Sequence, residues 1–346
     1  MPVETKPAVK RRRRNNAAPG ALTLREVAKA AGVSTASASR ALTRPELVSE
    51  ALKEQVERAA LTLGYVPNAA AQSLSGHPRR LVGVVLGGLE DPIAMAIVRA
   101  MEHRLASRDV TLLIATGADT QVETAKRVRE LVGRGADALL FGNGAVPLRP
   151  SSETQPHHIP WAALDAGARD LDIHSASGFD RARAYALAAT YLGNLGHRRV
   201  ALLARGGDRL AAAVGAAMGE TDILLSRAAA PKGGAPGIAT WLSALRGLSA
   251  PPTALVCGSD ALAAAALDAC RRQSIVIPQE LAVVGFGDSD LARYTRPTLT
   301  TIRVPTAEAG VAAAEYVLAL LEGRPAPVAR LAVKVIARES SAPLRM

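Results

Sequence analysis

The chain has 346 residues, with 42 Lys and Arg against 31 Asp and Glu, which gives a formal net charge of +11. This length exceeds that of one small domain, and the basic balance favours a polyanionic partner. No apolar run approaches the roughly 20 residues that cross a bilayer. Cys257 and Cys270 have neither the number for a disulfide framework nor the spacing of a zinc site. We therefore expect a cytoplasmic protein with no membrane partner, no metal and no cofactor.

Residues 1–21 contain five successive positive charges, from Lys10 to Arg14, without apolar periodicity. We expect a disordered basic arm that adds non-specific affinity for phosphates, although a solubilising tail fits the same residues. A twin-arginine export signal is disfavoured, because Asn15 and Asn16 follow the run and the next apolar stretch is short. Residues 1–76 hold twelve Lys or Arg and six Asp or Glu, so positive charge is densest at the front of the chain.

Residues 22–63 have the pattern of three helices around a small core. We expect a first helix capped by Thr23 that runs to about Ala31, a second over about Thr35–Leu42 capped by Ser34, and a third over Glu50–Leu63 capped by Ser49. Small or apolar residues stand where two helices crossing at a tight turn must pack, namely Val27, Ala28, Ala31, Gly32, Val33, Ala38, Ala41 and Leu42. This is the pattern of a helix-turn-helix, although ordinary amphipathic helices also fit it.

The second of these helices leaves Thr35, Ala36, Ser39 and Arg40 on its outer face. Short side chains with one arginine suit a helix that lies in the major groove of DNA. After the third helix, the run Gly64-Tyr65-Val66-Pro67-Asn68 ends that helix and can cap a further short helix over Ala69 to Leu74.

From residue 79 onward, apolar runs rich in Val, Leu and Ile alternate with helical patterns across short connections. This alternation favours parallel sheets covered by helices, in two successive halves. Ligands in such sheets bind outside the carboxyl ends of the strands. Acidic residues follow several of the strand-like runs, so one cleft could collect Asp165, Ser259-Asp260 and Gly287-Asp288.

The front of the chain closely resembles the LacI/GalR family of transcriptional regulators. The family pattern T-L-x-D-V-A-x-x-A-G-V-S-x-x-T-V-S-R-x-L, then V-S, then L-G-Y-x-P-N-x-x-A-x-x-L, is matched almost throughout. The departures are Glu26 for Asp, Ser37 for Thr and Ala38 for Val. The resemblance implies an all-α helix-turn-helix DNA-binding head, joined by a hinge helix to an α/β core of two periplasmic-binding-protein-like subdomains with parallel sheets.

The resemblance also implies the domain boundaries. The expected order is a basic arm over 1–21, the DNA-binding domain over 22–66, the hinge helix and linker over 67–78, an N-subdomain over 79–178 with 302–322, and a C-subdomain over 179–301 with 323–346. In the family the chain crosses three times between the subdomains, and we place the second crossing near Thr301.

By the same resemblance, Thr35 and Ala36 occupy the positions that select the operator, and Arg40 that of an arginine that contacts a guanine. Leu74 matches a leucine that enters the minor groove, although packing against the next domain is an alternative. The further DNA-binding positions are Thr23, Ala71 and the phosphate-contacting Ser34, Ser37, Ser39, Tyr65 and Asn68.

For the core, the resemblance places Asp165, Arg209, Ser259 and Asp260 on effector-pocket positions, with Arg209 as the anchor for a hydroxyl or carboxylate. We add Asp288, which follows a strand at the same edge. Each of these residues could instead be a helix cap or a surface charge.

Departures from the family pattern bear on the effector. The usual N-P-F-F is Asp91-Pro92-Ile93-Ala94 here, the usual Asp after G-F is Gly287, and aromatic residues make up only 3% of the chain. Fewer carboxylates and rings favour an acidic or small effector over a neutral hexose. The head and the G-F-G-D run look most like gluconate-responsive repressors.

The sequence thus predicts a DNA-binding transcriptional regulator, a repressor of carbon-source genes that binds a palindromic operator as a homodimer. A sugar acid or sugar derivative in the cleft is expected to control it. A solute-binding protein with the same core is the alternative. An enzyme is disfavoured, because the motifs of a P-loop, a dinucleotide fold, a nucleophile elbow and a zinc protease do not occur.

The segment Asn68 to Leu74 is too short to form a stable helix alone, since isolated helices under about 12–15 residues are marginal in water. We expect it to become ordered only when two copies pack together on DNA. Amide hydrogen exchange should therefore show protection of these residues in the operator complex. Equal protection in the free protein would contradict this prediction.

Overall fold

The computed structural model describes residues 22–66, 80–117, 120–142, 159–164, 175–204, 224–226, 234–327 and 329–343. The chain divides into two compact units, Met1–Arg79 and Arg80–Met346, which are described one at a time. The expected basic arm over residues 1–21 and the expected hinge helix, Asn68 to Leu74, lie outside the described residues.

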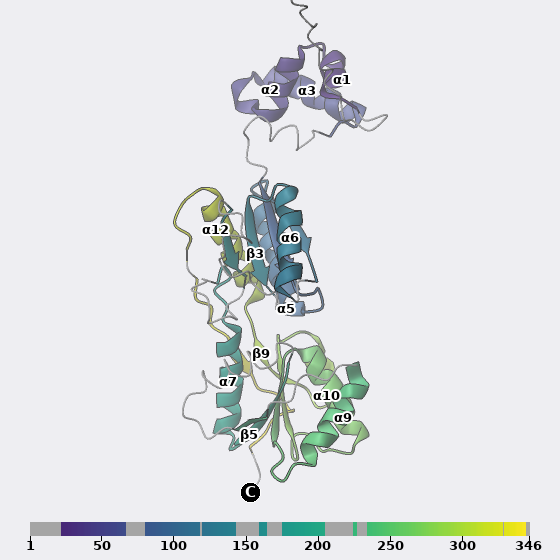
Figure 1. Cartoon of the computed structure of the whole chain (residues 1–346), viewed down its shortest axis with the longest axis vertical. Helices are drawn as coiled ribbons and strands as arrows, with labels where there is room; N and C mark the ends of the chain where they lie inside the picture. The colour runs from purple at the N-terminus through teal and green to yellow at the C-terminus, as the bar shows by residue number, and fades with distance from the viewer. Residues whose placement is uncertain are drawn as a thin grey trace, which may run out of the picture. The chain divides into compact units, whose positions relative to one another are not determined.

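The first unit contains the three predicted helices, α1 (Leu24–Ala30), α2 (Thr35–Thr43) and α3 (Glu50–Leu63), with a 3-10 turn over Pro45–Leu47 (Figure 1). The helix boundaries confirm the expected ones to within one residue. The backbone N–H of Ser37 donates to Ser34 Oγ at 3.0 Å, and that of Leu52 donates to Ser49 Oγ at 3.4 Å, so both predicted serine caps form.

Small side chains form the core of this unit. The fully buried residues are Val27, Ala28, Ala31, Ala38, Ala41, Val56 and Ala60. Gly32 has a φ of +63°, a conformation that other residues adopt only at a cost, so it permits the tight turn between α1 and α2. Gln55 Nε2 donates to the Ala31 carbonyl at 2.8 Å, which ties α3 to the end of α1.

The second unit begins with a parallel four-stranded sheet of order β2-β1-β3-β4. Its strands are β1 (Leu81–Leu86), β2 (Thr111–Ala115), β3 (Ala138–Gly142) and β4 (Trp161–Ala163), with helices α5 (Pro92–Ala106) and α6 (Gln121–Gly133). Val82 and Val84 of β1 pack in the same cluster as α5, whereas Val85 packs with α6. Successive residues of β1 therefore pack against helices on opposite faces of the sheet, so both faces are buried, as the continuous apolar runs predict.

A six-stranded sheet of order β10-β9-β8-β7-β5-β6 follows, parallel except for β10. Its strands are β5 (Arg199–Leu203), β6 (Leu224–Ser226), β7 (Ala254–Cys257), β8 (Ala282–Phe286), β9 (Thr300–Arg303) and β10 (Lys334–Ile336). Helix α7 (Arg181–Asn194) packs on one face, and α9 (Gly234–Arg246) and α10 (Asp260–Arg272) on the other; α11 (Leu291–Tyr294) lies between β8 and β9 in the chain.

Helix α12 (Thr306–Leu321) follows β9 in the chain but packs on α5 and β3 of the first sheet (Figure 1). We call the four-stranded sheet with α5, α6 and α12 the first lobe, and the six-stranded sheet with its helices the second lobe. A Cβ at Gly310 would lie 2.6 Å from the Ile97 carbonyl oxygen, so the two helix backbones touch there. Arg104 Nε donates to Glu315 Oε1 at 2.8 Å beside this contact.

None of the helices in the described part of the chain combines the length and the apolarity that are needed to span a bilayer.

The α5–α12 contact predicts opposite effects for two glycine substitutions. Gly310→Ala should lower the free energy of unfolding by about 2 kcal/mol, because the methyl group meets the backbone of α5. Gly133→Ala at the end of α6 has no atom within 4 Å of the new methyl and should raise stability by about 0.5 kcal/mol. Urea unfolding of both variants tests this, and equal effects would contradict the packing argument.

Candidate functional site

The outer face of α2 is exposed and carries short side chains. Thr35, Ala36 and Arg40 are exposed, Ser39 is half-buried, and Ala38 and Ala41 pack inward. Arg40 Nε donates to the Ala36 carbonyl at 3.4 Å within the same helix. The outer face of the helix therefore consists of short side chains and one long, positively charged side chain. Such a face fits a DNA groove lined with phosphates and base edges.

Other predicted DNA-binding residues lie in the same unit. Glu26 accepts hydrogen bonds from Thr23 N at 2.7 Å and Thr23 Oγ1 at 2.9 Å, which lower the pKa of Glu26. The hydroxyls of Ser34 and Ser37 lie 2.9 Å apart at the start of α2. Tyr65 is half-buried, and this burial raises the pKa of its phenol.

In the second unit the two lobes meet where β1 and β8 end. Asp91 follows β1, and its Oδ1 caps α5 by accepting from Ile93 N at 2.9 Å and Ala94 N at 3.3 Å. Its Oδ2 accepts from Arg181 at 2.8 Å, at the first residue of α7 in the second lobe. The two side chains are 14% and 16% exposed. Facing carboxyl ends of parallel strands are the usual place for a ligand cleft.

Arg181 is held against aromatic rings. Its guanidinium carbon lies 5.7 Å from the ring centroid of Phe179 and 5.8 Å from that of Phe286, distances at which a cation is attracted to ring faces. The ring centroids of Tyr185 and Phe286 lie 4.6 Å apart, and burial raises the pKa of the Tyr185 phenol. Sequence reasoning missed this group; the only signals were the unusual Asp91 and the phenylalanine of the G-F pair.

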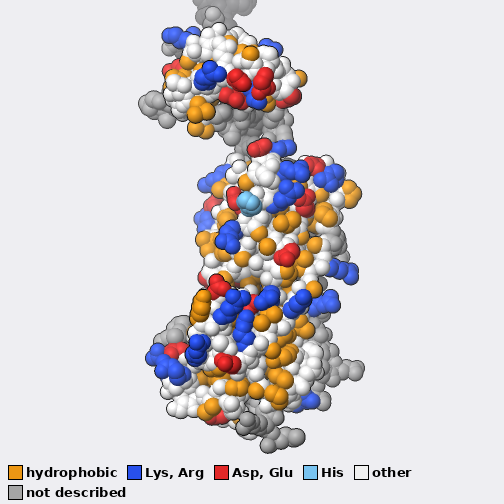
Figure 2. Space-filling view, turned by 180° about the vertical axis from the view of Figure 1, so that it is seen from behind, with side chains coloured by type: hydrophobic (Ala, Val, Ile, Leu, Met, Phe, Trp, Pro, Cys, Tyr) orange, Lys and Arg blue, Asp and Glu red, His pale blue; other side chains and the backbone are white. Residues whose placement is uncertain are grey.

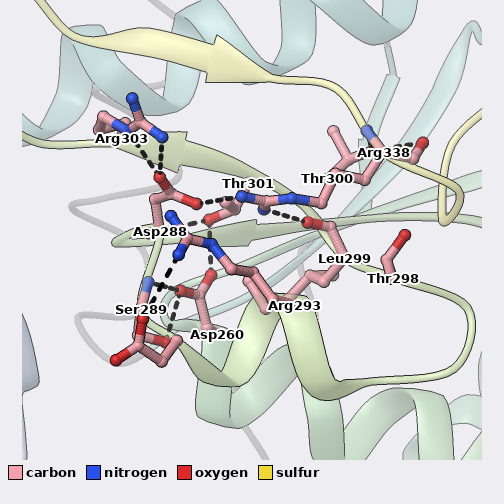
Figure 3. A network of polar contacts seen from close by, with 12 residues as sticks. Asp260, Asp288, Ser289, Arg293, Thr298, Leu299, Thr300, Thr301, Arg303 and Arg338 are labelled. Carbon is pink, nitrogen blue, oxygen red and sulfur yellow. Dashed lines mark hydrogen bonds and ion pairs between the residues drawn. The ribbon is translucent and has the colours of Figure 1, made fainter.

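Asp260 is buried and accepts three hydrogen bonds from its own chain (Figure 3). The donors are Thr301 Oγ1 at 2.5 Å, Ser289 N at 2.6 Å and Ser289 Oγ at 2.8 Å. The neighbouring Ser259 caps α10 by accepting from Leu262 N at 3.2 Å. Both residues therefore hold the loop after β8 and the start of α10 in place.

Asp288 forms ion pairs with Arg338 and Arg303, each at 2.6 Å, and only 3% of its side chain is exposed (Figure 3). Burial raises the pKa of Asp288, but the hydrogen bonds and charges of Arg338 and Arg303 outweigh that effect and lower it overall. Arg293 and Arg296, which follow Asp288 closely in the sequence, are exposed. Figure 2 shows Lys and Arg side chains gathered on one face of the second lobe.

Known proteins match both parts of the chain. Residues 23–68 match the signature "Bacterial regulatory proteins, lacI family", and residues 189–341 match "Periplasmic binding protein-like domain". The regulator GalS of Salmonella typhimurium is 32% identical over 305 residues, which cover 86% of this chain and 89% of GalS. The chain belongs to the LacI family.

More distant LacI-family proteins agree with this assignment. The repressor CytR of Escherichia coli K12 is 29% identical over 316 residues, or 88% of this chain and 91% of CytR. The Lac repressor bound to ONPG has the same fold, with a TM-score of 0.75 at 23% identity over 93% of this chain and 100% of that one. This chain is therefore a DNA-binding transcriptional regulator with a periplasmic-binding-protein-like core, and the relatives named here are regulators rather than enzymes.

The predicted LacI-family site residues have different outcomes. Asn68, Ala71 and Leu74 of the hinge, and Asp165 and Arg209 of the pocket, lie outside the described residues. The fold brings Ser259, Asp260 and Asp288 together, but their described partners are groups of the protein itself. Their contact with an effector stays a prediction. The described residues contain no cluster of three or more His, Cys, Asp or Glu that could hold a metal.

The pairing of Asp288 predicts a pH-dependent contribution to stability. Asp288→Asn should lower the free energy of unfolding at pH 7 by about 2–3 kcal/mol, because Arg338 loses its buried counter-charge. The lowered pKa means that this contribution is present above the unfolded-state pKa of about 3.9 and is lost as the pH falls through the folded-state value.

Urea unfolding of the wild type and Asp288→Asn from pH 7 down to the acid limit of folding measures this contribution. The difference between them should shrink only below about pH 4. Asp290→Asn is the matched control, because Asp290 is 82% exposed and lies 3.8 Å from Arg293. A difference that does not depend on pH would contradict the role of the Asp288 charge.

Proposed function

We propose that this protein is a homodimeric repressor of genes for the use of a sugar or sugar acid, acting on chromosomal DNA in the cytoplasm. Two copies of the DNA-binding unit would bind the two halves of a palindromic operator, and a small molecule in the cleft between the lobes would control the affinity. The observation that carries this proposal is the exposed face of α2, with Thr35, Ala36 and Arg40 on a well-packed three-helix unit.

The DNA contacts follow from the chemistry of that face. Arg40 can donate two hydrogen bonds to one guanine, a pairing worth roughly 1–3 kcal/mol of discrimination. Thr35 and Ala36 are short enough to bring the helix close to neighbouring bases. The phosphates, which fix the register of the helix, would be bound by Ser34, Ser37, Ser39, Thr23 and Tyr65 of the same unit. Asn68, Ala71 and Leu74 would complete the contact at the operator centre.

The control step needs a ligand that binds two states of the core unequally, because only a differential affinity can shift an equilibrium. The facing carboxyl ends of β1 and β8 support a ligand site between the lobes. Among the relatives, GalR is a LacI-family regulator and two proteins are ribose operon repressors, which supports a carbon-source effector. Screening sugars, sugar acids and their phosphates by thermal shift tests this, because a bound effector stabilises the folded state.

Selection of bound sites from random DNA, followed by footprinting, tests the DNA-binding part. We expect a palindrome of roughly 14–20 base pairs with a deformable central step, because two recognition helices must enter successive major grooves. Uniform protection without a preferred sequence would overturn the proposal.

Arg40→Ala should weaken operator binding by about tenfold or more and relax specificity at one symmetric base pair of each half-site. Arg58→Ala is the matched control, because Arg58 is an exposed arginine of α3 that lies 3.8 Å from Glu54. It should change the operator affinity by less than about twofold, since exposed ion pairs contribute little. Equal losses in both variants, measured by gel shift at one fixed salt concentration, would show only non-specific charge attraction.

A further inference from the structure

The ion pair between Asp91 and Arg181 joins the two lobes. Asp91 belongs to the first lobe and Arg181 to the second, and 90 positions separate them in the chain. Both side chains are largely buried, at 14% and 16% exposure. Opening the lobes at this point would separate a carboxylate from a guanidinium that water reaches only in part.

The two carboxylate oxygens of Asp91 have separate roles. Oδ1 caps α5, and Oδ2 accepts from Arg181. Asn is as good an N-cap as Asp, so capping does not require the negative charge. The charge of Asp91 therefore serves Arg181.

Arg181 is built as an anion site. Its guanidinium lies over the rings of Phe179 and Phe286, and a planar arginine fork matches a carboxylate or a phosphate. Asp91 already places one carboxylate oxygen, Oδ2, on this guanidinium at 2.8 Å.

The other acids near the end of β8 do not compete for Arg181 in the described structure. Asp260 accepts from Thr301 and Ser289, and Asp288 is paired with Arg303 and Arg338. Gly287 has a φ of +123°, and a Cβ there would lie 3.4 Å from Ile93, so a side chain at this position would be strained and crowded. Asp91 is thus the acid that balances Arg181.

We propose that Arg181 is the anion anchor of the cleft and that Asp91 is its internal counter-ion. The effector would then carry a carboxylate or phosphate, and it would bind by replacing Asp91 on Arg181, which breaks the ion pair between the lobes. This inference rests on the proposed function of the cleft as the effector site, and it names the chemical class of the effector and the contact through which it acts.

Inorganic phosphate is the probe, titrated into the full-length protein without DNA at constant ionic strength, with binding followed by the rise in Tm. Asp91→Asn keeps the α5 cap but removes the competing charge, so its phosphate affinity should exceed that of the wild type by about tenfold or more. Glu315→Gln is the matched control, since it neutralises the partner of Arg104 within the first lobe. Both variants contain the same basic DNA-binding unit, so phosphate that binds there affects them equally. Glu315→Gln should therefore retain the wild-type phosphate affinity.

The double variant Asp91→Asn with Arg181→Gln should lose the gain, because the anchor is absent. Gluconate should behave as phosphate does, and glucose, its neutral counterpart, should not distinguish Asp91→Asn from the wild type. Equal phosphate affinity in Asp91→Asn and Glu315→Gln, or a gain that survives in the double variant, would overturn the proposal.

These results are separate from those that test the proposed function. Operator selection and footprinting use the free protein and DNA without effector. A protein that recognises a palindrome but shows no effect of Asp91→Asn on phosphate binding retains the proposed function and lacks the anion anchor. A protein that shows the effect but no preferred DNA site has the anchor and lacks the proposed function.

Discussion

The packing of α12 on α5 is the contact on which the architecture of the core depends. The chain builds the first sheet, passes to the second, and then returns over Thr306–Leu321 before it adds β10. Buried alanines of α12 and the close approach at Gly310 complete the core of the first lobe. The first lobe is therefore incomplete without residues that follow almost the whole second lobe in sequence. The two lobes are thus linked through the chain and through this helix, although each has its own sheet.

The two lobes also share part of their hydrophobic core. One hydrophobic cluster runs through both, from Ile97 of α5 to Phe286 of β8. Among the described residues the chain passes from the second sheet to the first between β9 and α12, and returns to the second sheet before β10. The ion pair of Asp91 with Arg181 joins the lobes beside Phe286 of this shared cluster.

Asp260 and Asp288 are both bound by groups of their own chain. Asp260 binds the loop that contains Ser289 and the strand that contains Thr301, and Asp288 joins β9 to the C-terminal segment through Arg303 and Arg338. A buried carboxylate is stable only with donors or cations around it, and here the chain supplies them itself. Arg181, by contrast, is paired with a carboxylate of the other lobe, Asp91.

The helices of the DNA-binding unit could be predicted to within a residue, because their signals are local. Ser34 and Ser49 cap the helices that follow them directly, and Gly64 ends α3 with a φ of +66°. The strands could be predicted because short apolar runs bounded by turn residues are typical of buried strands. By contrast, the partners of the candidate pocket residues could not be predicted. Asp288 and Arg338 are 50 positions apart, and neither sequence neighbourhood indicates the other.

The sequence by itself determined that this chain carries a DNA-binding unit of the LacI type. That information lies in one contiguous stretch, in which the residues cap and pack against helices close to them in the sequence. Only the tertiary structure decided which groups of the chain Asp260 and Asp288 contact. Asp260 and Asp288 follow their strands as predicted, and the fold brings hydroxyls and guanidinium groups of the same chain to them, while their contact with an effector stays a prediction. Whether a carboxylate binds a ligand or its own protein depends on which donors the fold brings within hydrogen-bond distance, and those donors come from elements far away in the sequence.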